Sequence, residues 1–150
     1  MQDAHISTLH RAFLDIFGVL NRPDVDERVV RESGIGIERA LFPLLVGIDL
    51  YGPIGVVELA DRAGRDYTTV SRQVGKLDEL GLVARQPSPD DARVRRATVT
   101  KKGKVMVEKV NATRQQRGRA ILADWPAADV DALVRLVRRF ADDLVADADR

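Results

Sequence analysis

The sequence predicts a mainly α-helical protein that carries a small β hairpin of two or three strands. Apolar residues recur at steps of three and four in most of the 150-residue chain, as they do on one face of an α-helix. Two short β-favouring segments, 82–85 and 97–100, flank about twelve residues that include Pro87 and Pro89. Further glycines and prolines separate the periodic segments from one another.

The first third of the chain predicts two helices joined by a connection. Residues 4–20 show the apolar period of an amphipathic helix, and residues 37–51 show it again. Between them, residues 21–36 mix Pro23 and two glycines with charged residues, so we expect a connection with about one helical turn. Pro43 lies inside the second helix, where it either kinks the helix or marks its true first turn.

Two short helices and the hairpin occupy the middle of the chain. The first helix, residues 56–63, stops at Gly64, and the second, residues 67–80, follows Asp66, which is a good N-cap residue. Gly81 stands where a helix commonly ends in a left-handed residue. The expected inward residues of the second helix are Val70, Val74, Leu77 and Leu80. Two helices joined by a tight turn, then a hairpin, are the plan of a winged helix-turn-helix.

Two long helices are predicted to close the chain. One covers about residues 102–123 and ends before Trp125-Pro126, and the other covers about residues 128–147. The last helix has the clearest apolar stripe, made of Val130, Leu133, Val134, Val137, Phe140, Ala141, Leu144 and Val145. The small winged lobe cannot cover these stripes and that of residues 4–20, so their burial needs a partner surface.

Positive charge is concentrated in one part of the chain. The formal net charge of the whole chain is only +1. Residues 65–104, however, hold ten Lys and Arg against five Asp and Glu, whereas the rest of the chain holds fourteen against eighteen. Such a run can be a solvated face, but within an otherwise acidic chain it favours a polyanionic partner.

The composition also argues against several classes of protein. Cysteine is absent, which excludes disulfides, thiolate zinc sites and redox sensing by a thiol. His5 and His10 do not share a helix face, so we expect no metal site and no cofactor. The sequence has no phosphate loop, nucleophile elbow or metal-ligand spacing, and we expect it not to be an enzyme. No apolar run approaches the ~18 residues of a membrane span and no signal peptide is recognisable, so we expect no membrane partner and a cytoplasmic protein.

The helix predicted at residues 67–80 suits the major groove of DNA. That groove is about 12 Å wide and accepts one α-helix, whose side chains then meet the base edges. Arg72 can donate two hydrogen bonds to a guanine, and hydroxyl side chains can reach phosphates, bases or a thymine methyl. We therefore expect sequence-specific binding to double-stranded DNA through Thr68, Thr69, Ser71, Arg72 and Lys76.

The stretch of residues 52–103 resembles the DNA-binding lobe of the MarR family of bacterial regulators. The specific part is an Asp-x-Arg at Asp91-Ala92-Arg93, with Thr100 seven residues later and then Gly103. The segment VSRQVGKLDELGLVAR is similar to the family's DNA-reading helix and first wing strand. The flanking helices also fit, so the resemblance covers essentially the whole chain, and we expect one domain over residues 1–150.

The resemblance implies a role for the wing. In the family the arginine of the Asp-x-Arg enters the minor groove and the aspartate holds the wing. Arg93 is therefore expected to enter the groove, while Asp91 pairs with an arginine near the wing. A narrow A·T-rich minor groove does attract a guanidinium. Arg95 and Arg96 are neighbours on a strand, so at most one faces DNA squarely, and phosphate contacts are expected for them.

The resemblance also implies an assembly and its control. The winged lobe is expected at about residues 37–102, and helices at about 4–20 and 102–147 are expected to form a two-fold homodimer. Such a dimer binds a pseudo-palindromic operator with half-sites roughly 10 base pairs apart. The family further implies a repressor that a small aromatic effector releases. The residues that can line an effector crevice are His10, Phe13, Phe17, Phe42, Tyr51 and Trp125.

A different function remains open from the sequence alone. Some winged lobes dock onto other proteins, and such a module has the same pattern of helices and strands. The local net charge of +5 in residues 65–104 and the arginine at position 93 favour DNA over a protein partner. We therefore expect a transcriptional regulator.

Overall fold

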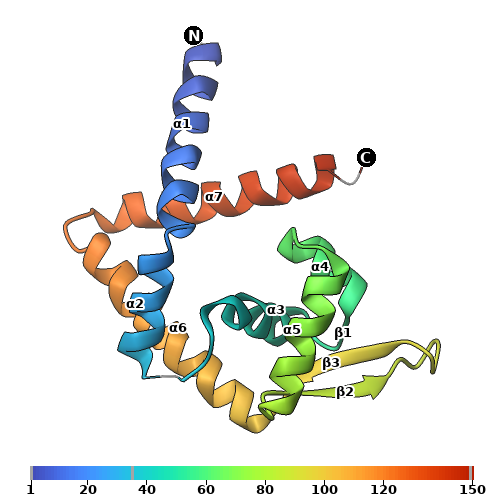
Figure 1. Cartoon of the computed structure of the whole chain (residues 1–150). Helices are drawn as coiled ribbons and strands as arrows, with labels where there is room; N and C mark the ends of the chain where they lie inside the picture. The colour runs from blue at the N-terminus through green and yellow to red at the C-terminus, as the bar shows by residue number, and fades with distance from the viewer. Residues whose placement is uncertain (1, 35, 149) are drawn as a thin grey trace. The chain divides into compact units, whose positions relative to one another are not determined.

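The computed structural model describes residues 2–34, 36–148 and 150 of the chain. It confirms a mainly helical fold with one small antiparallel sheet (Figure 1). In chain order the elements are α1 (Gln2–Leu20), α2 (Pro23–Ser33), the 3₁₀ helix η1 (Arg39–Leu41), α3 (Phe42–Tyr51), β1 (Ile54–Gly55), α4 (Val56–Ala63), α5 (Tyr67–Glu79), β2 (Val83–Pro87), β3 (Arg95–Val99), α6 (Lys101–Ile121) and α7 (Ala127–Ala148).

The chain divides into two compact units. Met1–Thr113 holds the sheet and the helices from α1 to the first part of α6, and Arg114–Arg150 holds the rest of α6 and α7. The apolar core of the first unit lies between α3, α5, the sheet and the start of α6, and its completely buried residues include Leu44, Leu45, Val70, Val74 and Val110. Within the described residues, no helix is both long enough and apolar enough to cross a bilayer.

The segment of residues 21–36 is more helical than the sequence predicted. We expected a connection with about one helical turn, and the structure instead has the 11-residue helix α2. A proline occupies its first turn, where a missing N–H costs nothing, and Gly34 ends it at φ 69°. Val29 anchors α2 in the core at 7% exposure. The prediction was wrong because charged residues dominate this segment and hide its short apolar period.

Pro43 marks the first turn of α3 and does not kink a longer helix. The 3₁₀ helix η1 precedes it, and α3 begins at Phe42, so the proline stands where no helical N–H is needed. This confirms one of the two alternatives. The helix then buries Leu44, Leu45 and Ile48 on the side that faces the core.

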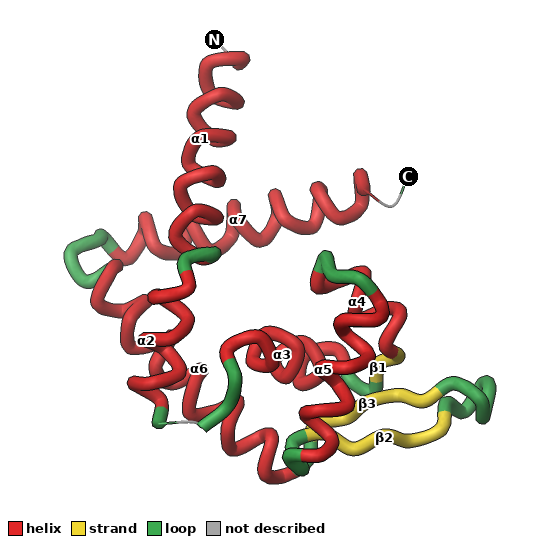
Figure 2. Tube along the Cα trace, in the orientation of Figure 1, coloured by secondary structure: helices red, strands yellow, loops and turns green. Residues whose placement is uncertain are grey.

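Helices α4 and α5 form the helix-turn-helix pair (Figure 2). Gly64 ends α4 in the left-handed region at φ 61°, and Asp66 caps α5. Three of the four expected inward residues of α5 are fully buried: Val70, Val74 and Leu77. The expectation for Leu80 was wrong, since its side chain is 44% exposed. Leu80 is the C-cap residue, at which the chain already leaves the helix.

The three strands pair in the order β1-β3-β2, and the β2–β3 hairpin forms the wing (Figure 2). The hairpin is longer than the sequence predicted, because Pro87 still pairs with Arg95 and only residues 88–94 remain as a loop. A proline is tolerated there because β2 is an edge strand. The two-residue strand β1 adds a third strand through the pairing of Ile54 with Ala97.

Thr100 and Gly103 fix the start of α6 against the turn that follows α5. The Thr100 hydroxyl donates to the Gly81 carbonyl at 2.6 Å and accepts from the Gly103 N–H at 3.1 Å. A Cβ atom at position 103 would collide with the Leu82 carbonyl oxygen. These two residues therefore hold the wing strands and α6 in register with the end of α5.

Candidate nucleic-acid interface

The outward face of α5 gathers the polar residues that the sequence singled out. Thr68, Arg72 and Lys76 are exposed and follow one another at steps of four, so they share one face of the helix, opposite its buried side. Thr69 and Ser71 are half-buried at the edges of this face. The face presents two cations and several hydroxyl groups without an acid until Asp78.

Asp66 fixes the first turn of α5. Its Oδ1 accepts a hydrogen bond from the Thr69 N–H at 2.9 Å. Hydrogen bonding from the Thr69 side chain, and then from its backbone N–H, lowers the pKa of Asp66 below its ordinary value of 3.8. Because the carboxylate form is favoured in the folded protein, the cap stabilises the fold while Asp66 is ionised.

We expect the contribution of this cap to depend on pH in a defined direction. A lowered pKa in the folded state means that the stabilisation is complete above pH 3.8 and is lost as the pH falls through the lowered value. Asp66→Asn keeps a cap acceptor that does not titrate in this range. Urea unfolding of both proteins from pH 6 down to pH 3 should show the wild type losing stability relative to Asp66→Asn. A difference that does not change with pH would contradict this account.

Lys76 is engaged in the free protein. Its Nζ lies 3.3 Å from Oε2 and 3.4 Å from Oε1 of Glu38, which precedes η1. Both side chains are largely exposed, and exposed pairs of this kind contribute only about 0–1 kcal/mol. A phosphate can therefore replace Glu38 as the partner of Lys76.

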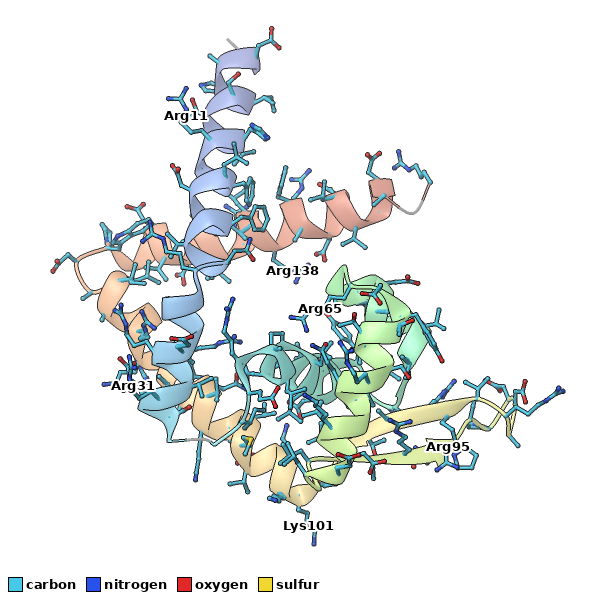
Figure 3. The ribbon with its side chains drawn as sticks, in the orientation of Figure 1. Arg11, Arg31, Arg65, Arg95, Lys101 and Arg138 are labelled. Carbon is cyan, nitrogen blue, oxygen red and sulfur yellow. The ribbon has the colours of Figure 1, made fainter. Side chains whose placement is uncertain are left out.

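Arg65 is a positioning residue for α5 that the sequence did not reveal. Its Nη1 donates to the Ala40 carbonyl at 2.9 Å and to Oε1 of Gln73 at 3.2 Å. Figure 3 shows Arg65 beside the N-terminal end of α5. The side chain thus joins the segment η1 to the helix. The sequence shows Arg65 only as one of the ten cations of residues 65–104. Its role does not stand out there, because the Ala40 carbonyl lies far away along the chain.

Arg93 is exposed at the tip of the wing. The Arg93 side chain is 93% exposed, and its only ion pair with a described residue joins Nε to Oδ1 of Asp91 at 3.5 Å. The same oxygen accepts from the Arg93 N–H at 2.9 Å. Asp91 therefore folds the loop on itself, and the Ser88 N–H closes it by donating to the Val94 carbonyl at 2.7 Å.

The two arginines of β3 have different surroundings. Arg96 is half-buried, and its Nη2 lies 3.6 Å from Oδ2 of Asp90. Arg95 is exposed on the hairpin (Figure 3) and shares a strand face with the buried Ala97, since side chains alternate along a strand. Ala97 belongs to the core into which α5 packs. Of the two arginines, Arg95 is therefore the one whose side chain lies on the face of the hairpin toward α5.

The aromatic residues that the sequence offered for an effector crevice lie in several environments. Phe42 is buried at 3% exposure, and the rings of Phe13 and Phe17 stack with centroids 6.1 Å apart. His10 and Trp125 are exposed. Tyr51 carries the Arg62 guanidinium 4.2 Å above its ring. Tyr51 also borders a pocket of about 280 Å³ between α3 and α4, with Pro43, Val46, Gly47, Leu50, Leu59, Arg62, Ala63 and Arg65.

Comparisons with known proteins agree on one family. The MarR family model matches residues 37–95. The uncharacterized HTH-type transcriptional regulator YxaD of Bacillus subtilis is 33% identical over 103 residues, which are 69% of this chain and 72% of that protein. A MarR family protein from Bacillus stearothermophilus superposes with a TM-score of 0.80 at 20% identity, covering 97% of this chain and 99% of that one. Staphylococcus aureus MarR, solved in complex with salicylate and kanamycin, gives a TM-score of 0.69 at 20% identity, covering 95% and 97%. The chain belongs to the MarR family of transcriptional regulators.

Proposed function

We propose that this regulator binds a pseudo-palindromic operator on double-stranded DNA as a homodimer. In each subunit α5 enters the major groove and the wing enters the neighbouring minor groove. One observation carries the proposal: the same lobe presents Thr68, Arg72 and Lys76 on one helix face and Arg93 at the tip of an exposed hairpin. Ser71 and Thr69 at the edges of that face, and Arg95 on the wing, are proposed to contact the backbone.

A homodimer is supported by the apolar side chains that α1 and α7 leave exposed. On α7 these include Val134 at 64%, Leu144 at 58% and Val145 at 60% exposure. Complete burial of one such side chain contributes roughly 1.5–3 kcal/mol. We propose that helices at about 4–20 and 102–147 form the dimer and that the lobe at about 37–102 binds DNA. Two copies of α5 would then lie about 34–36 Å apart, one turn of the duplex.

Selection of duplexes from a random pool tests the proposal. We expect enrichment of a two-fold symmetric sequence with half-sites about 10 base pairs apart. Binding should weaken steeply with added salt, because several lysines and arginines displace counterions from the phosphates. A pool that yields no common sequence even at low salt would contradict the proposal and favour the docking of a protein partner.

We also propose that the protein represses transcription and that a small aromatic molecule releases it. Staphylococcus aureus MarR, which shares this fold, was solved with salicylate bound. An effector changes DNA affinity only if it binds the free and the DNA-bound arrangements unequally. Transcription in vitro from a promoter that overlaps the selected operator should fall with added protein and recover with salicylate. An increase in transcription on adding the protein would contradict the repressor role. If no aromatic compound restores transcription, the proposed release is contradicted.

Arg93→Ala is expected to weaken operator binding at least tenfold without loss of stability. The side chain is 93% exposed, so its removal leaves no cavity, while the cation in a narrow A·T-rich minor groove is lost. Fluorescence anisotropy measures the affinity, and thermal unfolding measures the stability. Exchange of A·T for G·C pairs under the wing should weaken the wild type more than Arg93→Ala. Equal affinities of the two proteins for the operator would show that the wing does not enter the groove.

A further inference from the structure

Arg85 lies on β2, where the wing packs against α5. Its Nε is 3.5 Å from Oδ2 of Asp78, near the end of α5. A Cβ atom at Gly75, one turn earlier, would lie 3.4 Å from Nη2 of the arginine. The guanidinium thus lies close to the surface of α5 at Gly75.

The guanidinium of Arg85 keeps its hydrogen-bonding capacity in the free protein. An arginine has five N–H donors in a planar fork. The Arg85 side chain makes no hydrogen bond with any residue that the structure describes, and its one ion pair there is the 3.5 Å contact with Asp78. Nε is buried, but the side chain as a whole is 29% exposed. The outer nitrogens are therefore available to a ligand.

A row of cations leads from α5 to the wing tip. The hairpin pairs Arg85 with Ala97 and Pro87 with Arg95. Because side chains alternate along each strand, Arg85 and Arg95 share one face of the hairpin as diagonal neighbours, about 7–8 Å apart. Arg93 lies beyond them in the loop. We call Arg85, Arg95 and Arg93 the basic row.

The shape of the DNA duplex indicates which part of the DNA contacts the basic row. One sugar-phosphate strand separates each major groove from the neighbouring minor groove. A protein with a helix in one groove and a wing in the next must straddle that strand at the junction of helix and wing. We propose that Arg85 binds a phosphate of this strand, next to the contact of Arg95, and so sets the spacing between α5 and the wing on DNA. This inference rests on the proposed DNA binding.

The chemistry of Arg85 suits this ligand. A guanidinium binds phosphate through two parallel hydrogen bonds, and such charge-assisted bonds are strong. Asp78 is 47% exposed, so its pairing with Arg85 is weak enough for a phosphate to compete. Phosphate contacts orient a protein but carry no sequence information. Arg85 should therefore support binding to every duplex and not only to the operator.

Arg85→Gln tests the inference in the full-length protein. We expect about tenfold weaker binding, measured by fluorescence anisotropy, to both the operator and an unrelated duplex of equal length. The slope of log Kd against log salt should decrease by about 0.9 for each subunit. Arg150→Gln removes an exposed arginine paired with Asp147 at 3.6 Å and should change neither quantity. Weaker operator binding with an unchanged salt slope would overturn the inference, because it indicates a structural role only.

Removal of single phosphate charges locates the contact. We expect neutral methylphosphonates between the two grooves to weaken the wild type, whereas Arg85→Gln should be insensitive at one of these positions. Equal sensitivity of both proteins at every position would overturn the inference. If the wild type itself does not prefer the operator to the unrelated duplex, the proposed function fails instead.

Asp78→Asn provides a second test that does not remove the arginine. The substitution frees Arg85 from its competing carboxylate, so it should tighten binding to both duplexes. Glu79→Gln is the matched control, since it removes the neighbouring exposed acid, whose carboxylate forms no ion pair with Arg85. We expect Asp78→Asn to raise affinity more than Glu79→Gln does. Equal effects of the two substitutions, or weaker binding by Asp78→Asn, would contradict the role of Arg85.

Discussion

Val134→Asp should give a folded monomer whose operator affinity is at least about a hundredfold lower than that of the wild type. Val134 is 64% exposed on α7, so the fold of one chain does not depend on its burial. In the proposed dimer the new carboxylate would be buried without a partner, which costs several kcal/mol. A monomer holds one half-site only and loses the avidity of the second, commonly a factor of about 10²–10⁴.

Ala146→Asp is the matched control for this substitution. Ala146 is exposed on the same helix, nine residues after Val137 of the stripe, and nine residues correspond to about 180° around a helix. The new carboxylate therefore falls on the face away from the apolar stripe. Sedimentation equilibrium should find a dimer for Ala146→Asp and a single chain for Val134→Asp. A Val134→Asp protein that remains dimeric would show that the α7 stripe is not the interface.

Arg72→Ala should lower both the affinity for the operator and the preference for its sequence. Arg72 is exposed at the centre of the outward face of α5, where two hydrogen bonds to a guanine contribute about 1–3 kcal/mol of discrimination. We expect the binding free energy for the operator to weaken by most of this amount, and the binding free energy for an unrelated duplex to weaken by less. The preference for guanine should be relaxed at one position in each half-site.

The measurement for Arg72 is the ratio of the affinities for the operator and for single-base variants of it. Arg139→Ala removes an arginine of α7 that is 78% exposed and lies on the polar face of that helix. This control should leave the ratio unchanged. If Arg72→Ala weakens all duplexes by the same factor, Arg72 contacts phosphate and does not read a base.

The bounds of α5 follow from the sequence because both ends of the helix carry local signals. Asp66 caps the start, and Gly81 follows the end at φ 72°. Helix α2 has local signals as well, a proline in its first turn and Gly34 at its end, but most of its residues are charged. Its apolar period is therefore too short to predict a helix. The hairpin was predicted too short, because pairing partners rather than propensity keep Pro87 in β2.

Partners that are distant along the chain were beyond the reach of the sequence. Glu38 pairs with Lys76 and Arg65 with the Ala40 carbonyl, separations of 38 and 25 residues. The position of Arg85 over Gly75 likewise depends on how β2 packs against α5. The sequence supplied the residue types of the interface and their helical face, and the tertiary packing determines which cations are engaged.

A hydroxyl-radical footprint on the selected operator tests the central claim most directly. If two copies of α5 and the wing bind one duplex, the protected sugars should form a two-fold symmetric pattern with centres about 10 base pairs apart. Each half should include a minor-groove segment that loses its protection in Arg93→Ala. A single unrepeated protected segment, or protection that Arg93→Ala leaves intact, would contradict the account.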